Sequence, residues 1–266
     1  MLNIHIASRS ERGARQGNED DLRHGNASVG WYAVVADGAG GHSRGAEAAQ
    51  RAVTCIESLL IEQALSFTPA NLTYAVHTAH AEVKRHQTSV QLDARMHCTL
   101  VVLWIEPMAN YALWTHVGDS RLYRIRQGIS ELLTIDDSVV QRMVRAGLIT
   151  AEQASHHPQK NQLLAALGIE GDVSPHTVVR PVELRDGDAF LLCTDGWWET
   201  LDGVSLVATM AASQTPAEWL DRMQRHIEAR ANPKQDNFSA VAVWVGDPSE
   251  VTQCGPDDTV PRVQRS

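Results

Sequence analysis

Residues 115–128 read Thr-His-Val-Gly-Asp-Ser-Arg-Leu-Tyr-Arg-Ile-Arg-Gln-Gly (THVGDSRLYRIRQG). The pattern predicts a strand, a tight turn at Gly118-Asp119, a second strand and a further turn at Gln127-Gly128, because β-branched and aromatic residues alternate with turn formers. No helix separates the two strands, which favours antiparallel over parallel pairing.

Similar apolar runs recur along the chain, each bounded by Gly, Asp or Pro, and they predict further strands. These runs are Asn3–Ala7, Trp31–Ala36, Cys98–Ile105, Ala109–Val117, Leu122–Arg126, His176–Val182, Ala189–Cys193 and Phe238–Val245. Helical periodicity covers Gly45–Leu65, Pro69–Thr88 after an N-cap at Thr68, and a segment from Thr215-Pro216 to about Ala231. The set predicts an α+β fold, with helices packed on an antiparallel core.

Residues 136–170 differ from the rest, because short helical pieces are interrupted by Gly147 and His157-Pro158. We expect helices at Ser138–Ala146, Ala151–Ala154 and Asn161–Leu167, forming a flap inserted between strands. Residues 247–266 are rich in Asp, Pro, Gly and Thr and predict a flexible polar tail. The expected organisation is one domain over residues 1–246, followed by that tail.

The composition excludes several classes of protein. The 266 residues carry a net charge of −9, which disfavours nucleic acid and anionic membranes as partners. No apolar run approaches the roughly 20 residues of a membrane-spanning helix, and the N-terminus lacks a signal-peptide core. The 4 cysteines are far apart with no CxxC pair, which predicts free thiols and a cytoplasmic location.

Several carboxylates stand beside the predicted strands. Asp37 and Asp195 each follow a strand and precede Gly, Asp119 lies in the turn after Val117, Asp236 precedes the last strand, and Glu19-Asp20 stand before the Trp31 strand. Alone, an Asp-Gly pair is most often a turn. Gathered at one rim, however, these groups would repel one another unless cations neutralise them.

Oxygen ligands without paired Cys or His favour Mg²⁺ or Mn²⁺. The Ca²⁺ loop with its distal Glu is missing. Residues 38–45, GAGGHSRG, fit neither the Walker A nor the dinucleotide pattern, but glycine beside Asp37 allows the Gly38 carbonyl to approach an ion. Arg15 is the candidate for gripping a phosphate, although a surface role is as common for such an arginine.

Taken in order, these segments resemble the type 2C family of metal-dependent serine/threonine protein phosphatases, in particular its bacterial members. The matching pieces are Arg12-Gly13-Ala14-Arg15, Asn18-Glu19-Asp20, Val35-Ala36-Asp37-Gly38-Ala39-Gly40-Gly41-His42, Val117-Gly118-Asp119-Ser120-Arg121, Ala146-Gly147-Leu148-Ile149-Thr150, His157-Pro158 with Ala166-Leu167-Gly168, Cys193-Thr194-Asp195-Gly196 and Asp236-Asn237. The resemblance implies a four-layer sandwich of two antiparallel sheets flanked by helices, with the metals at one edge.

The resemblance also implies a set of metal ligands for two Mn²⁺ or Mg²⁺ ions. Asp37 would bridge both ions, with Gly38 adding its carbonyl, and Asp195 and Asp236 would complete one site. Glu19 and Asp20 would support the other site, partly through waters. Asp119, together with Asp195, would hold a third and weaker ion.

The implied activity is hydrolysis of phosphoserine or phosphothreonine in proteins by a metal-bridging hydroxide, which reverses a serine/threonine kinase. Arg15 would bind the phosphate, and His42 is close enough in sequence to the acidic centre to touch substrate. Two positions depart from the family: Ala39 cannot act as a general acid, and Ala165 stands where the flap usually carries Arg. The piece Asp195-Gly196-Trp197-Trp198-Glu199 resembles phosphatases of type VI secretion clusters, which oppose a threonine kinase.

Two other functions remain open. A catalytically weakened relative would bind phosphoproteins as a regulator, and a different two-metal phosphohydrolase, such as a nuclease, would share the acids. The complete acid set disfavours the first, and the acidic charge with no basic stripe disfavours the second. Among the 12 histidines, neither His77 with His80 nor His156-His157 has a matching ligand pattern for zinc. We expect a monomer.

Overall fold

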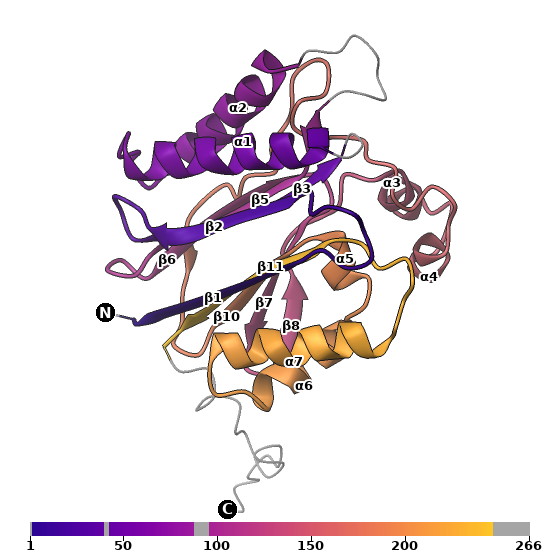
Figure 1. The fold of residues 1–266 in the computed structure, drawn as a ribbon. Helices are drawn as coiled ribbons and strands as arrows, with labels where there is room; N and C mark the ends of the chain where they lie inside the picture. The colour runs from indigo at the N-terminus through magenta and orange to yellow at the C-terminus, as the bar shows by residue number, and fades with distance from the viewer. Residues whose placement is uncertain (1, 40–42, 88–95, 247–266) are drawn as a thin grey trace, which may run out of the picture.

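The computed structural model describes residues 2–39, 43–87 and 96–246, and its described strands form two antiparallel sheets (Figure 1). The first sheet has the order β1 (Ile4–Glu11), β11 (Phe238–Val245), β10 (Ala189–Cys193), β7 (Arg121–Arg126) and β8 (Ile129–Leu132). The second has the order β2 (Asp20–Asn26), β3 (Trp31–Ala39), β5 (Leu100–Glu106), β6 (Tyr111–Val117) and β9 (Val182–Glu183), and the short β4 (His97–Cys98) also pairs with β3. The α+β prediction is confirmed.

Helices cover the outer face of each sheet, which makes four layers (Figure 1). Helices α1 (Ser43–Ile61) and α2 (Pro69–Arg85) pack on the second sheet, and α6 (Gly203–Ala211) and α7 (Pro216–Ala229) pack on the first. Thr68 and Thr215 cap α2 and α7 as predicted, each accepting a backbone N–H. The four-layer sandwich implied by the resemblance is therefore the fold of this chain.

The alternation of strand side chains produces three apolar layers. In β3, Tyr32, Val34 and Ala36 pack under α1 and α2, while Ala33 and Val35 pack between the two sheets. Strands β10 and β11 are likewise buried on both faces. Both sheets are thus held at a fixed separation, and so are the side chains at their ends.

The segment quoted at the outset forms its two strands, but they lie in different sheets. Strand β6 belongs to the second sheet and β7 to the first, and the turn through Gly118 crosses between them. Gly118 has a φ of +95°, a conformation that favours glycine. The next turn does close a hairpin: Gln127 and Gly128 both have positive φ, and Arg126 pairs with Ile129.

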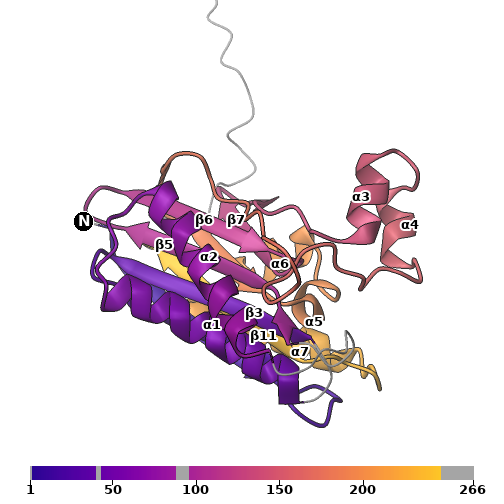
Figure 2. The same cartoon turned by 90° about the horizontal axis from the view of Figure 1, so that it is seen from above.

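Helices α3 (Val139–Arg145) and α4 (Ala151–Ser155) stand out beyond one end of the sandwich, as Figure 2 shows, whereas Leu167 near the end of segment 136–170 is buried in the core. Both helices begin at capped positions, Ser138 and Thr150. The helix expected at Asn161–Leu167 is wrong. That segment is irregular, with Leu163 bridging Ser138 and Leu167 bridging Cys98, because its backbone groups form hydrogen bonds with these distant residues instead of with one another.

Other boundaries also differ from expectation. The strand expected at His176–Val182 is reduced to Val182–Glu183, since Pro181 cannot donate a ladder hydrogen bond. Strands β2 and β8 and helices α5 (Asp195–Trp198) and α6 were not expected. Within the described ranges, no helix is long and apolar enough to cross a membrane. The predicted tail, residues 247–266, lies outside the described residues.

Candidate active site

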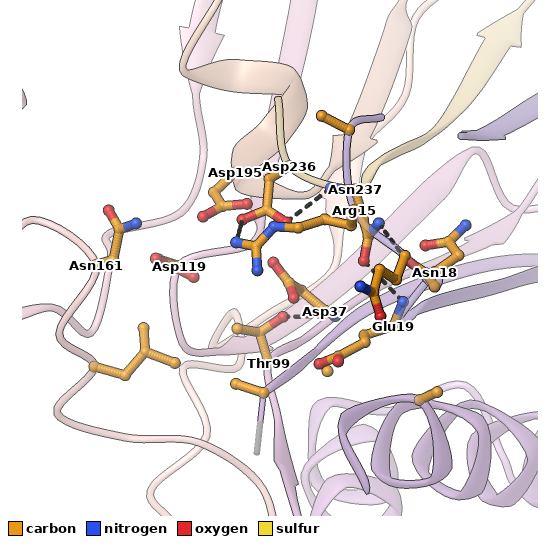
Figure 3. Close-up of a pocket in the computed structure, with 17 residues that line it drawn as sticks. Arg15, Asn18, Glu19, Asp37, Thr99, Asp119, Asn161, Asp195, Asp236 and Asn237 are labelled. Atoms are coloured by element: carbon orange, nitrogen blue, oxygen red, sulfur yellow. Dashed lines mark hydrogen bonds and ion pairs between the residues drawn. The ribbon is translucent and has the colours of Figure 1, made fainter. Parts of the chain in front are cut away.

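A cleft of about 960 Å³ opens at the end of the sandwich where the two sheets meet the flap segment. Its lining comes from the loop before β2, the end of β3, the β6–β7 turn, the start of α5 and the residues before β11. Figure 3 shows the carboxylates of Asp37, Asp119, Asp195 and Asp236 around a common space. We call these four residues, with Glu19 and Asp20, the aspartate cleft.

Asp37 and Asp20 lie on neighbouring strands. Their Cα atoms are direct partners in the β2–β3 register, so both carboxylates belong to the same end of the second sheet. The Asp37 backbone is fixed by Thr99: its N–H donates to Thr99 Oγ1 at 3.0 Å, and its carbonyl accepts from the Thr99 N–H at 2.8 Å. Asp37 is thus held at one position in the cleft.

Gly38 lies where two backbones cross. A Cβ at this position would stand 2.1 Å from the Gly45 carbonyl oxygen and 2.6 Å from the Glu19 carbonyl oxygen. A Cβ on Gly45 would stand 2.3 Å from Glu19 Oε2. Because glycine has no side chain at these two positions, the start of α1 can lie directly against the β3 terminus and the Glu19 loop.

Asp195 and Asp119 come from the first sheet and from the crossing turn. Asp195 begins α5 immediately after β10, and Asp119 follows Gly118 in the turn. The preceding residue, Thr194, ties the two sheets together, because its Oγ1 donates to Asp20 Oδ2 at 3.0 Å and accepts the Ser239 N–H. The Asp119 carbonyl accepts from Trp198 Nε1 at 3.0 Å.

Asp236 and Arg15 form an ion pair over the cleft, with 2.5 Å between Arg15 NH2 and Asp236 Oδ2 (Figure 3). The Arg15 side chain is 59% exposed, so its guanidinium is open to solvent. Asn237 anchors the loop that carries Arg15: it accepts the Glu19 N–H and donates to the carbonyls of Arg12 and Gly17. One buried amide therefore fixes the loop that supplies both a cation and a carboxylate.

The buried carboxylates of the cleft are strained electrostatically. Burial, followed by the charge of Asp195, raises the pKa of Asp119 to about 8. Burial is also the largest cause of the rise in the pKa of Asp20 to about 7 and of Asp195 to about 6. The pKa of Asp37 is raised well above its ordinary range by burial and then by Asp20 and Asp195.

Two buried carboxylate oxygens of the aspartate cleft have no hydrogen-bond partner. Asp20 Oδ1 and Asp195 Oδ1 are both buried without a hydrogen-bond partner. Buried carboxylate oxygens that lack donors and repel one another are the arrangement that a divalent cation satisfies. The donor set consists of carboxylates and a backbone carbonyl, so it fits Mg²⁺ or Mn²⁺.

The structure brings most of the predicted site residues together; Asp20 lies deeper than expected, and His42 is not described. Arg15, Glu19, Asp37, Gly38, Asp119, Asp195 and Asp236 all line the cleft, whereas Asp20 lies behind them, under Thr194. His42 is outside the described residues. Ala39 lines the cleft, and its methyl group offers no proton.

The sequence interpretation missed the polar residues that hold or extend the site. Thr99 and Thr194 position Asp37 and Asp20, and Asn161 of the flap segment lines the cleft on the Asp119 side (Figure 3). The two threonines stand beside predicted strand ends, which is a signal that could have been used. Asn161 gave none, because a helix was expected there.

The chain matches the sequence profile described as "Protein phosphatase 2C" over residues 8–238. The serine/threonine protein phosphatase PstP of Mycobacterium tuberculosis is 33% identical over 248 residues, which cover 92% of this chain and 46% of PstP. This chain therefore spans about half the length of that relative. The serine/threonine phosphatase stp of Listeria innocua is 30% identical over 223 residues, covering 82% of this chain and 87% of stp.

Solved structures agree with the sequence matches. The catalytic domain of PstP in complex with 2 manganese ions superposes with a TM-score of 0.77 at 28% identity, covering 93% of this chain and all of that one. PppA, described as a key regulatory component of the type VI secretion system in Pseudomonas aeruginosa, gives a TM-score of 0.74 at 28% identity, covering 91% of this chain and 97% of PppA. The matching profile, the bacterial serine/threonine phosphatase relatives and the two-sheet sandwich show that this chain belongs to the protein phosphatase 2C family.

Proposed function

We propose that the chain hydrolyses phosphoserine and phosphothreonine in proteins, using Mn²⁺ or Mg²⁺ held in the aspartate cleft. The observation that carries the proposal is the convergence of buried, mutually repelling carboxylates with unpartnered oxygens at Asp20 and Asp195. When bound, two such ions lower the pKa of water and offset the charge of a transferring phosphoryl group. Family membership and the manganese in PstP support the same assignment.

The ligands proposed for the ions are those expected from the sequence. Asp37 interacts electrostatically with Asp20 of the second sheet and with Asp195 of the first, so we propose that it contacts both ions. Gly38 lines the same cleft, and its carbonyl would be a further ligand. The remaining ligands are Glu19, Asp20, Asp195 and Asp236, with Asp119 and Asp195 for a third ion. Asp20 does not line the cleft, so it would contact the ion indirectly, through Asp37 or through a water molecule.

Arg15 is proposed to bind the phosphate. Its planar guanidinium carries five donors, one of which lies on Asp236, and its exposure leaves the others free to turn toward a phosphate at the cleft mouth. Ala39 cannot move a proton, so the leaving serine or threonine oxygen takes its proton from solvent in this proposal.

The deciding experiment follows phosphate release from a phosphothreonine peptide with Mn²⁺, with Mg²⁺ and with EDTA. Turnover that requires metal and is lost in Asp195→Asn supports the proposal. The matched control is Asp221→Asn, a carboxylate paired with Arg9 away from the cleft, which should keep full activity. Binding of the peptide without turnover would instead indicate a regulator, and hydrolysis confined to nucleic acid would indicate a nuclease.

Finer assignments belong to the same proposal. The Asp195–Glu199 motif and the likeness to PppA support a role in reversing a kinase of type VI secretion. The free thiols of Cys55, Cys98 and Cys193 support a reducing compartment such as the cytoplasm. That the chain acts as a monomer on a phosphorylated protein is part of the same proposal. Comparing the phosphoproteins of cells with and without the gene tests the first point: type VI secretion proteins should gain phosphate, and unchanged phosphorylation of those proteins would contradict it.

A further inference from the structure

A second group of potential metal ligands lies outside the aspartate cleft, on the other side of the Gly118 turn. His116 of β6, Asp137 of the segment after β8, and His176 of the segment before β9 each offer one ligand atom, and these atoms lie within 4.8 Å of one another. We call these three residues the histidine cluster. Neither their spacing in sequence nor the family resemblance assigns them a role.

His116 has the electronic arrangement of a metal ligand. Its ring is buried, and Nε2 lies 2.9 Å from the Ile135 carbonyl, which can only accept, so the proton is on Nε2. The lone pair is then on Nδ1, which is buried without a hydrogen-bond partner. Histidine ligands typically donate the other ring N–H to a carbonyl or carboxylate in this way, which fixes the tautomer.

The backbone brings the other two ligands to the same place. The His176 N–H donates to the His116 carbonyl at 3.0 Å, and the two imidazole rings lie 4.8 Å apart between centroids. Asp137 Oδ1 lies 2.8 Å from His176 Nε2, while Oδ2 accepts the Gly118 N–H at 3.0 Å. The cluster is therefore preformed on hydrogen bonds to β6 and to the turn that follows it.

The chemistry of the cluster differs from that of the cleft. Two imidazole nitrogens and one carboxylate select Zn²⁺ and related transition metals over Mg²⁺. Ligand atoms of a tetrahedral zinc ion lie roughly 3.3 Å apart, given bonds of about 2.0–2.2 Å. The His176 ring now stacks on His116 with 20° between the ring planes, so this half-exposed side chain must turn its ring to direct a nitrogen at the same ion. Because the His176 side chain is half-exposed, solvent water would supply a fourth ligand.

We propose that His116, Asp137 and His176 bind one transition-metal ion of the zinc class, separate from the ions of the aspartate cleft. Asp137 connects this site to its surroundings. Its N–H donates to the Gly118 carbonyl at 3.0 Å, and its own carbonyl accepts from Leu164 at 2.7 Å. An ion held by Asp137 fastens the base of the flap segment to the turn that carries Asp119.

The test is a titration of chelator-stripped protein with Co²⁺ and then Zn²⁺ in excess Mg²⁺, which occupies oxygen ligands but competes poorly for imidazole. We expect one equivalent of Co²⁺ with the strong visible absorption of tetrahedral coordination, displaced by Zn²⁺. In His176→Ala the affinity should fall by more than the roughly 10–100-fold that loss of an outer partner costs. His226→Ala, an exposed histidine on α7, should bind as the wild type does.

Three results would overturn the proposal. The wild type could fail to bind Co²⁺ tightly in excess Mg²⁺, His176→Ala could bind it unchanged, or Asp195→Asn could abolish the signal and so place the ion in the aspartate cleft. Thermal melts of each variant check the fold, and the half exposure of the His176 side chain makes its removal tolerable. Mn²⁺-dependent turnover by His176→Ala is read separately, so failure here leaves the proposed function standing.

Discussion

The aspartate cleft and the histidine cluster lie on opposite sides of one glycine, Gly118, and their polar groups differ in how far they are satisfied by hydrogen bonds. In the cleft, carboxylates face one another, burial and repulsion raise their pKa values, and two oxygens have no donor. In the cluster, each residue already accepts or donates a hydrogen bond, and His116 Nδ1 is a buried nitrogen without a partner. The carboxylates of the cleft therefore need cations to offset their repulsion, whereas the histidine cluster is stabilised by its own hydrogen bonds and has a nitrogen lone pair available for a cation.

The largest expected effect separates the two sites directly. Asp37→Asn removes the carboxylate at the centre of the cleft and should lower Mn²⁺-dependent hydrolysis at least about a thousandfold, roughly 4 kcal/mol of transition-state stabilisation. Co²⁺ absorption from the histidine cluster should be unchanged. Steady-state kinetics and the titration on one preparation measure both. Full activity in Asp37→Asn would show that Asp37 is not part of the catalytic site. Loss of the Co²⁺ absorption in that variant would show that the cleft and the cluster bind the same ion.

Arg15→Ala should come next, acting on the cleft alone. We expect kcat/KM for a phosphothreonine peptide to fall about 10–100-fold, in the range of a lost charge-assisted contact. Arg15→Lys should recover part of it, because lysine keeps the charge without the fork. Arg12→Ala, an exposed neighbour, is the control. Kinetics of Arg15→Ala equal to the wild type would assign Arg15 to the Asp236 ion pair only.

The two sites should respond oppositely to pH. For metal-free protein, folded Asp20, Asp119 and Asp195 keep protons that the unfolded chain has released above its ordinary carboxyl pKa, so the free energy of unfolding falls as pH rises toward 8. Burial lowers the pKa of His116 in the folded protein. The free energy of unfolding that depends on neutral His116 therefore decreases as the pH falls below the ordinary pKa of histidine.

Thermal melts in EDTA measure the balance. Between about pH 6 and about pH 8 we expect the melting temperature to fall by at least about 3 °C. Mn²⁺ should stabilise the protein more at the higher pH, and Asp195→Asn should flatten the dependence. A melting temperature that rises with pH in EDTA would contradict the repulsion inferred for the cleft.

The smallest effect concerns the segment that adjoins both sites. Lys160 of the flap pairs with Glu199 at the end of α5, with 2.5 Å between Nζ and Oε1, and both side chains are partly exposed. Such a pair contributes about 0–1 kcal/mol, so Lys160→Ala should lower the melting temperature by less than about 3 °C. Differential scanning calorimetry measures it. A larger fall would show that the flap stabilises the sandwich and both sites with it.

The cleft was predictable because its acids stand at strand ends that the apolar pattern marks. Asp37 and Asp195 each follow a buried run and precede glycine, so the location of the strands located the carboxylates as well. The edge strand β2 was missed for the opposite reason: its sequence, DDLRHGN, is mostly polar and only partly buried, and among the described strands it pairs only with β3.

The rest depended on contacts between distant segments. Asn161–Leu167 has helical spacing, but bridges to Ser138 and Cys98 hold it in an irregular conformation. His116 and His176 are 60 positions apart and meet through a backbone hydrogen bond that no local pattern encodes. Likewise, strands β6 and β7 were located correctly, and only the tertiary structure shows that the Gly118 turn passes from one sheet to the other.

The pairing of β1 with β11 has a consequence for synthesis of the chain. Ile4 pairs with Val245 and Glu11 with Phe238, so β1 cannot form its sheet pairing until β11 has been synthesised. At ribosomal speeds of about 5–20 residues per second, that wait is on the order of 10–50 s, with an apolar strand unpaired on the nascent chain. Asp236 emerges in the same interval, so metal capture cannot guide early folding. We therefore expect β1 to join the first sheet late, in one closing step after β11 has been synthesised.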